Sequence, residues 1–292
     1  MFFVVPSPTL PIAFKKDIIC LYMSDQKISD PFLTAKKRQN FNMGKEMTIK
    51  KLFTALALTA SLTFSGQALA KDLIFATDTA FVPFSFKQGD DYVGFDVELW
   101  DAIAKDMGVT YKLQPMDFAG IVPGVQAGQI DVAMAGMSIT DARAKVVDFS
   151  DPYYNSGLLL LVRADSDIKS VDDIDGKIIA LKTGTGSVPY ATEHFKDSER
   201  RQFPNIDNAF MELQTGRVDG VLHDAPNVLY YAATGGKDKV KIIGKPMEAQ
   251  KYGAAFRKGS DLVEKYNTSL KNLKENGTYD RIYEKWFGEK PE

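Results

Sequence analysis

Apolar and polar residues alternate along the chain in short runs that predict alternating strands and helices. Residues 132–135 and 158–162 are continuous apolar runs typical of buried strands, and residues 95–107 carry apolar side chains at helical spacing until Gly108 ends the pattern. Further strands are predicted at 73–76, 111–114, 178–181, 202–203, 218–222, 241–243 and 252–256, and further helices at 121–127, from 187, and at 207–214, 226–232, 262–274 and 279–287. This order predicts an α/β fold with largely parallel sheets, in two doubly wound lobes of similar size.

The first 70 residues differ from the rest. Lys50 and Lys51 precede an apolar run at 52–64 that is too short to span a bilayer, and Ala68-Leu69-Ala70 follows as an A-x-A site. These features predict a secretory signal peptide at 47–70, cleaved after Ala70, and a periplasmic protein. Residues 1–46 lack clear periodicity, and we expect them to be a non-native upstream extension rather than part of the fold.

Composition narrows the possible chemistry. Residues 71–292 hold 27 Lys and Arg against 34 Asp and Glu, a formal charge of −7, which argues against nucleic acids and anionic membranes as partners. The single cysteine, Cys20, precedes the predicted cleavage site, so disulfide and thiolate chemistry are not expected in the mature chain. His194 and His223 show no metal-ligand spacing, and no metal or cofactor is expected.

The stretch 136–143 is a candidate anion site. Thr140 or Asp141 can cap a helix, which would place Arg143 in its first turn, where a cation is unfavourable against the helix dipole. A bound carboxylate would explain the arginine: Arg143 would hold it in a bidentate fork, and Ser138 with nearby N–H groups would complete the cradle. A solvated surface arginine fits this stretch alone equally well.

A second polar corner lies at 182–187, a Gly-Thr-rich turn after a predicted strand. It lacks the ending of a phosphate loop, and Pro189 replaces the last glycine of a dinucleotide fingerprint. Backbone N–H groups of such a turn suit a carboxylate, although an ordinary strand-to-helix turn remains an equal alternative.

Asp224 follows an apolar strand and precedes Ala225-Pro226. It could cap a helix, or neutralise a ligand ammonium at the mouth of a cleft. His223 is expected to orient Asp224 or fill the wall, because no nucleophile accompanies it to make a triad. Phe81 and Phe118, predicted in loops beside aspartates, could enclose a flat or aliphatic group, although core positions remain possible.

Taken together, the chain resembles the periplasmic solute-binding proteins of polar amino-acid ABC importers, solute-binding protein family 3. The resemblance covers nearly all of residues 71–290, and within the family it is greatest to the glutamine-binding members. The stretches that carry it are residues 76–84, 94–97, 115–118, 139–143, 148–150, 184–187, 201–209, 276–279 and 285–288.

The family implies a type II periplasmic-binding-protein fold, in which two lobes joined by two hinge strands close on one ligand. Lobe 1 would comprise residues 71–154 and 251–292, and lobe 2 residues 155–250. The partners implied are L-glutamine and an ABC-transporter membrane permease, the protein would be a monomer, and it would not be an enzyme.

The resemblance also implies roles for ten residues. Arg143 would hold the α-carboxylate with Ser138 and the Gly186 amide, and Asp224 and the Gly136 carbonyl would take the α-ammonium. Phe81 and Phe118 would flank the side chain, whose amide Asp78 and Lys182 would read with His223 nearby. Ser138 departs from the family, in which threonine is usual, but keeps the hydroxyl.

Two alternatives remain open from the sequence. An exported dehydratase on the same scaffold, acting on a carboxylated ring, would need a spare acid or base, for which His223 and Lys182 are the candidates. A sensor domain would pass ligand state to a receptor, but no transmembrane segment is predicted after residue 70.

Overall fold

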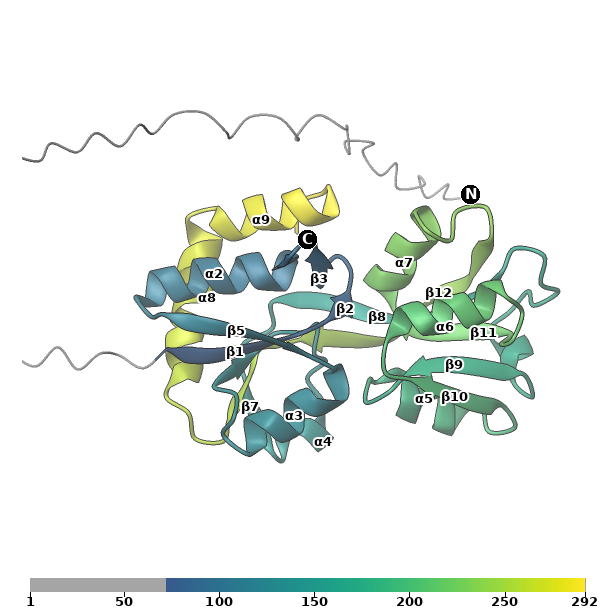
Figure 1. The fold of residues 1–292 in the computed structure, drawn as a ribbon, viewed down its shortest axis with the longest axis horizontal. Coiled ribbons are helices and arrows are strands. Elements are labelled where there is room, and N and C mark those ends of the chain that lie inside the picture. The colour runs from purple at the N-terminus through teal and green to yellow at the C-terminus, as the bar shows by residue number, and fades with distance from the viewer. Residues whose placement is uncertain (1–71, 292) are drawn as a thin grey trace, which may run out of the picture. The chain divides into compact units, whose positions relative to one another are not determined.

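The computed structural model describes residues 72–291, which fall within one compact unit, Ala70–Glu292. The predicted signal peptide and the segment 1–46 lie outside the described residues. Two lobes, each built on a five-stranded sheet, make up the described chain (Figure 1). The predicted α/β fold with two lobes is therefore confirmed.

The first sheet has the strand order β5-β1-β6-β13-β7. Its strands are β1 (Leu73–Asp78), β5 (Tyr111–Met116), β6 (Val132–Ala133), β7 (Val147–Phe149) and β13 (Ala255–Arg257). Helices α2 (Phe95–Met107), α3 (Phe118–Gln126) and α4 (Asp141–Ala144) connect them, and Gly108 ends α2 in the left-handed conformation, as its position predicts. Phe75 and Ala76, adjacent on β1, enter separate cores on opposite faces of the sheet, because successive side chains alternate.

The second sheet has the order β10-β9-β11-β8-β12. Its strands are β8 (Tyr154–Arg163), β9 (Ile178–Lys182), β10 (Glu199–Phe203), β11 (Gly220–Asp224) and β12 (Val240–Tyr252), and its helices are α5 (Ser187–His194), α6 (Ile206–Gln214) and α7 (Ala225–Ala233), with a 3₁₀ turn, η1, at Asp172–Ile174. Leu158 and Leu160 enter the core beneath α5, whereas Leu159 and Leu161 enter the core beneath α6 and α7. Burial on both faces explains the unbroken apolar run of β8.

Strands β8 and β12 also connect the lobes. They pair antiparallel from Arg163 opposite Val240 to Tyr154 opposite Tyr252, and extend from one lobe toward the other (Figure 1). The last helices, α8 (Leu262–Glu275) and α9 (Thr278–Phe287), pack with α2 in the core of the first lobe.

Two features differ from the sequence prediction. Each sheet is mixed rather than largely parallel, because β13 and β8 run against their neighbours as the chain crosses between lobes. The segment around Phe81, predicted as a loop, instead contains a small antiparallel sheet of β2 (Ala80–Phe81), β3 (Ser85–Gln88) and β4 (Asp91–Val93). Strands this short leave little periodicity for a sequence pattern to detect.

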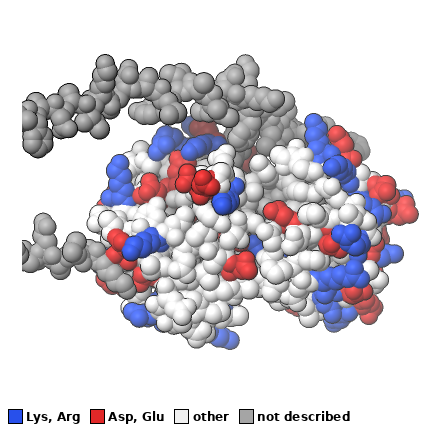
Figure 2. All heavy atoms as spheres, viewed as in Figure 1, with Lys and Arg blue, Asp and Glu red and all other residues white. Residues whose placement is uncertain are grey.

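Charged side chains are interspersed by sign on the face shown in Figure 2, with basic and acidic groups side by side over the second lobe. Among the described residues, none of the helices is long and apolar enough to cross a membrane.

Candidate functional site

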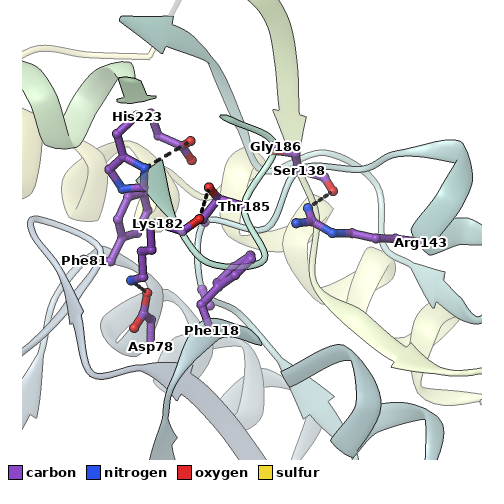
Figure 3. A pocket seen from close by; sticks show the side chains of 12 residues that line it. Asp78, Phe81, Phe118, Ser138, Arg143, Lys182, Thr185, Gly186 and His223 are labelled. Atoms are coloured by element: carbon purple, nitrogen blue, oxygen red, sulfur yellow. Dashed lines mark hydrogen bonds and ion pairs between the residues drawn. The ribbon is translucent and has the colours of Figure 1, made fainter. Parts of the chain in front are cut away.

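A small cavity, in which the space open to the centre of a water molecule is about 10 Å³, is lined by residues from both lobes (Figure 3). Strands β1, β9 and β11 end at this cavity, as expected for ligand sites at the carboxyl ends of strands in α/β sheets. Its lining comprises Asp78, Phe81, Phe118, Ala135, Gly136, Ser138, Arg143, Lys182, Thr185, Gly186, His223 and Asp224. The fold therefore brings all ten residues singled out from the sequence around one cavity.

One end of the cavity is occupied by an ion pair between the lobes. Asp78 is the last residue of β1 and Lys182 the last of β9, and the Lys182 ammonium contacts the Asp78 carboxylate directly (Figure 3). The Asp78 side chain is 3% exposed and the Lys182 side chain is 1% exposed. Burial raises the pKa of Asp78, which the charge of Lys182 opposes. Lys182 Nζ also lies 3.3 Å from the Ala80 carbonyl oxygen, so its donors point to the first lobe.

Two aromatic rings flank this ion pair. The Phe81 and Phe118 rings each have their centroid 6.0 Å from Lys182 Nζ, within the range of cation–π attraction. Neither residue lies in the loop predicted for it: Phe81 belongs to β2 and Phe118 is the first residue of α3. Both are buried and line the cavity, which makes them walls as well as core residues.

His223 completes the wall beside Phe81. Its ring meets the Phe81 ring edge-on at 5.7 Å, and neither ring nitrogen has a hydrogen-bond partner among the described residues. Burial, and then the charge of Lys182, hold its pKa well below the usual value, so the imidazole is neutral. Its Nδ1 lies 3.9 Å from Asp224 Oδ1, too far for a hydrogen bond. His223 therefore fills the wall and does not orient Asp224 in this geometry.

Arg143 lies at the opposite end of the cavity. Thr140 caps α4 and accepts from the Arg143 N–H at 3.3 Å, which fixes the arginine in the first turn as its spacing predicts. Arg143 Nη1 donates to the Ser138 carbonyl at 2.8 Å and Nη2 to the Gly184 carbonyl at 2.9 Å, joining the lobes. Desolvation lowers the pKa of Arg143, which nearby Asp224 raises. The guanidinium is thus held by neutral carbonyl groups at the cavity edge.

Asp224 stands at the N-cap position of α7, but its side chain makes no capping hydrogen bond. Its Oδ2 instead accepts from the Tyr252 hydroxyl at 2.6 Å. Burial raises the pKa of Asp224 to about 6, although the Tyr252 hydrogen bond and the charge of Arg143 act in the opposite direction. The Asp224 carboxylate therefore lines the cavity and does not cap helix α7.

Ser138 and Gly186 both contact Gln250, a residue of the crossing strand β12. Ser138 Oγ donates to Gln250 Oε1 at 2.6 Å. Gly186 is the N-cap residue of α5, and a Cβ there would lie 2.8 Å from Gln250 Nε2. A side chain at 186 would therefore displace Gln250.

Gly136 lies in the left-handed region, with φ of 55°. A Cβ at this position would lie 2.1 Å from the Phe81 ring, so only glycine allows the ring to cover the strand end. Its N–H donates to Asp96 Oδ2 at 2.8 Å.

Four residues at or beside the cavity were missed from the sequence: Ala135, Thr185, Gln250 and Tyr252. Thr185 could have been named from the sequence, because it lies within the Gly-Thr-rich turn at 182–187. In the structure its hydroxyl donates to the Lys182 carbonyl at 2.8 Å. Tyr252 and Gln250 belong to β12, and no local signal links them to the strand ends. Among residues 72–291, no cluster of His, Cys, Asp and Glu could hold a metal ion.

Comparison with known proteins decides the family. The model of bacterial extracellular solute-binding proteins, family 3, matches residues 73–289. The chain belongs to this family. The matched residues include both lobes, in agreement with the type II periplasmic-binding-protein fold of solute-binding protein family 3. The chain is therefore a binding protein rather than an enzyme.

Relatives within the family differ in the ligand named for them. The arginine-binding extracellular protein ArtP of Bacillus subtilis is 32% identical over 252 residues, covering 82% of this chain and 98% of the relative. The glutamine-binding protein GlnH of the same organism is 36% identical over 221 residues, covering 74% and 80%. The structure of an ancestral arginine-binding protein bound to glutamine is 43% identical, with a TM-score of 0.71, covering 75% of this chain and 98% of that one.

Proposed function

We propose that this family member captures L-glutamine outside the cytoplasmic membrane and delivers it to the permease of an ABC importer. The observation that carries the proposal is the buried ion pair between Asp78 and Lys182. A primary amide can enter between such a pair, because its NH₂ donates to the Asp78 carboxylate and its oxygen accepts from the Lys182 ammonium. GlnH is named for glutamine, and an ancestral arginine-binding protein has been solved with glutamine bound, so proteins similar to this chain can hold this ligand.

The charge balance of the cavity also favours glutamine over arginine. Asp78 and Asp224 oppose Lys182 and Arg143, and His223 is neutral, so the ionised side chains sum to zero. A glutamine zwitterion adds no net charge. Arginine would place a second buried cation beside Lys182, and glutamate a second anion beside Asp78, and an uncompensated buried charge is costly.

Within this proposal, Arg143 holds the α-carboxylate with Ser138 and Gly186, and Asp224 holds the α-ammonium with the Gly136 carbonyl. Among the described residues, the Arg143 guanidinium donates only to carbonyl groups, and the Asp224 carboxylate accepts from a hydroxyl. A zwitterion would give each of these groups its opposite charge. Phe81 and Phe118 would enclose the aliphatic carbons between the two ends.

The lobes contact one another around the cavity, so a ligand needs them to separate before it enters. Lys182 with Asp78, and Arg143 with Gly184, are contacts between segments of the two lobes. We propose hinge closure between residues 71–154 with 251–292 and residues 155–250, with β8 and β12 as the hinge. The segment 47–70 would direct export to the periplasm, and the protein would act as a monomer.

Isothermal titration calorimetry on residues 71–292 tests the proposal. Glutamine should bind more tightly than glutamate, arginine or asparagine, each added at the same pH and ionic strength. Arginine binding as tightly as glutamine, or the absence of binding to all four, would overturn the glutamine assignment. Mass spectrometry of the exported product tests cleavage after Ala70.

A further inference from the structure

Asp96 is a buried carboxylate directly behind the cavity. It is the second residue of α2, and its side chain is fully buried. Its N–H donates to the Phe84 carbonyl at 2.9 Å, which binds it to the segment that carries Phe81. Its Oδ2 accepts from the Gly136 N–H at 2.8 Å, across 40 residues of sequence. Asp96 thus holds two separate parts of the cavity wall.

The Gly136 segment has little freedom once this hydrogen bond forms. The N–H bond fixes the plane of the Ala135–Gly136 peptide, and the Phe81 ring covers the α-carbon so closely that a Cβ would lie 2.1 Å from it. The Phe84 N–H donates to the Phe81 carbonyl at 2.7 Å, so Asp96, through Phe84, also fixes the residue that covers Gly136.

A buried carboxylate without a cationic partner needs a reason. None of the ion pairs among residues 72–291 includes Asp96, and its Oδ1 has no hydrogen-bond partner among these residues. Besides the Gly136 N–H, the groups that interact with it are the Tyr153 and Tyr266 hydroxyls and the Asp78 carboxylate. Burial raises its pKa to about 7. A purely structural acceptor for one N–H could be an amide or a water molecule, at lower cost in desolvation.

We propose that Asp96 is a positioning residue for the ligand's α-ammonium group: it fixes the Ala135–Gly136 peptide through the Gly136 N–H, and with it the position of Gly136, whose carbonyl, in the next peptide, accepts from that group. The inference rests on the proposed function only in requiring an α-amino acid as ligand. Asp96 does not contact the ligand, and its carboxylate acts at the α-amino end, through the Gly136 N–H.

The test compares two ligands that differ only in the ammonium group. L-Glutamine has it, whereas glutaramate has the same carboxylate and amide with hydrogen in its place. In Asp96→Ala the Gly136 N–H is buried without a partner, a loss that we expect to weaken glutamine binding by about 5- to 150-fold. Glutaramate binding should change by less than about threefold, because the Asp96 carboxylate makes no hydrogen bond to Arg143, Asp78 or Lys182 among the described residues, and its one hydrogen bond is to the Gly136 N–H.

Asp96→Asn is the matched control, since its amide oxygen can still accept from the Gly136 N–H. Glutamine affinity should recover to within about fivefold of the wild type. Thermal unfolding confirms that each variant is folded, and should Asp96→Ala fail to fold, Asp96→Ser is measured in the same way. Weakening of both ligands by the same factor, or unchanged glutamine affinity in the alanine or serine variant, would overturn the inference.

A measurement on the wild-type protein is independent of any variant. The Gly136 amide proton, observed by NMR, should exchange slowly with solvent and should shift more with saturating glutamine than with saturating glutaramate. Rapid exchange, or equal shifts with both ligands, would contradict the inference. If the wild type prefers arginine, the glutamine assignment fails, and the same comparison with arginine and its deamino analogue still tests Asp96.

Discussion

The two ends of the cavity treat charge differently. At one end Asp78 and Lys182, both buried, are paired with each other across the lobes. At the other, Arg143 is held by two backbone carbonyls and Asp224 by a tyrosine hydroxyl, so neither is paired with a full opposite charge. The first end is complete without a ligand, and the second is completed by a zwitterion. The end with Arg143 and Asp224, here called the general end, should therefore bind any α-amino acid. The end with Asp78 and Lys182, the selective end, should select among them.

The largest effect should come from removing the general end. Arg143→Ala deletes the cation proposed to pair with the α-carboxylate, and we expect binding of every amino acid to weaken by about 2–5 kcal/mol, roughly 30- to 5,000-fold. Calorimetry with glutamine and arginine measures the loss. Arg143→Lys is the control, which keeps the charge but loses the fork and should weaken binding less. Affinity unchanged in the alanine variant would remove the carboxylate assignment.

The selective end can be inverted rather than removed. Lys182→Met leaves Asp78 buried without its partner, which costs about 3–5 kcal/mol. That cost falls on the closed form, and a ligand guanidinium would offset it. We therefore expect the preference to move from glutamine to arginine, with arginine raising the thermal midpoint more than glutamine does.

The double variant Asp78→Asn with Lys182→Met provides the control for this inversion. It removes both charges, so the arginine preference should disappear while binding through Arg143 and Asp224 remains. If Lys182→Met still preferred glutamine, Asp78 and Lys182 would not set the selectivity of this end.

The pH dependence of glutamine affinity should report on the general end, because Asp224 belongs to that end and has a pKa of about 6. Only its anion pairs with an ammonium, so glutamine affinity should fall about tenfold for each pH unit below 6. The raised pKa has the opposite effect on the ligand-free protein. A carboxyl that binds its proton more tightly when folded stabilises the fold as pH falls from 7 toward 5.

Calorimetry and thermal unfolding from pH 5 to 8 measure these two trends. Asp224→Asn should bind weakly, with a nearly flat pH profile between 5 and 7. A wild-type affinity that stayed constant down to pH 5 would argue against Asp224 as the partner of the ammonium.

The sequence predicted what depends on local chemistry. The spacing within Phe95–Met107 and the left-handed Gly108 fix α2 without help from the rest of the chain, and Thr140 caps α4 three residues before Arg143. The ten site residues could be chosen because strand ends in an α/β fold converge, and the resemblance to solute-binding proteins added their roles.

What the sequence could not decide depends on contacts between distant segments. Whether Asp224 caps α7 or faces the cavity is settled by Tyr252, which lies 28 residues further along the chain. Ser138 meets Gln250 across 112 residues, through a bridge between Ser138 and Tyr252 that no local pattern indicates. The crossing strand β12 therefore supplies the parts of the site that were missed.

The smallest effect should come from one of these missed residues. Tyr252→Phe removes the hydroxyl that donates to Asp224 at 2.6 Å and lies 2.9 Å from Ser156 Oγ, and keeps the ring in the core. Without this hydrogen bond the pKa of Asp224 rises above about 6, so at pH 7 a larger share of Asp224 is protonated and cannot pair with the ligand ammonium, and we expect glutamine to bind about three- to tenfold more weakly.

The same variant should also move the pH profile. The hydroxyl lowers the pKa of Asp224, so without it the midpoint of the affinity loss should rise above pH 6. Calorimetry across pH 5 to 8 on Tyr252→Phe beside the wild type measures both changes. An affinity loss with an unmoved midpoint would mean that Tyr252 supports the hinge alone, whereas a shifted midpoint ties the crossing strand to the charge at the general end, since Asp224 is the only group of that end whose hydrogen bond the substitution removes.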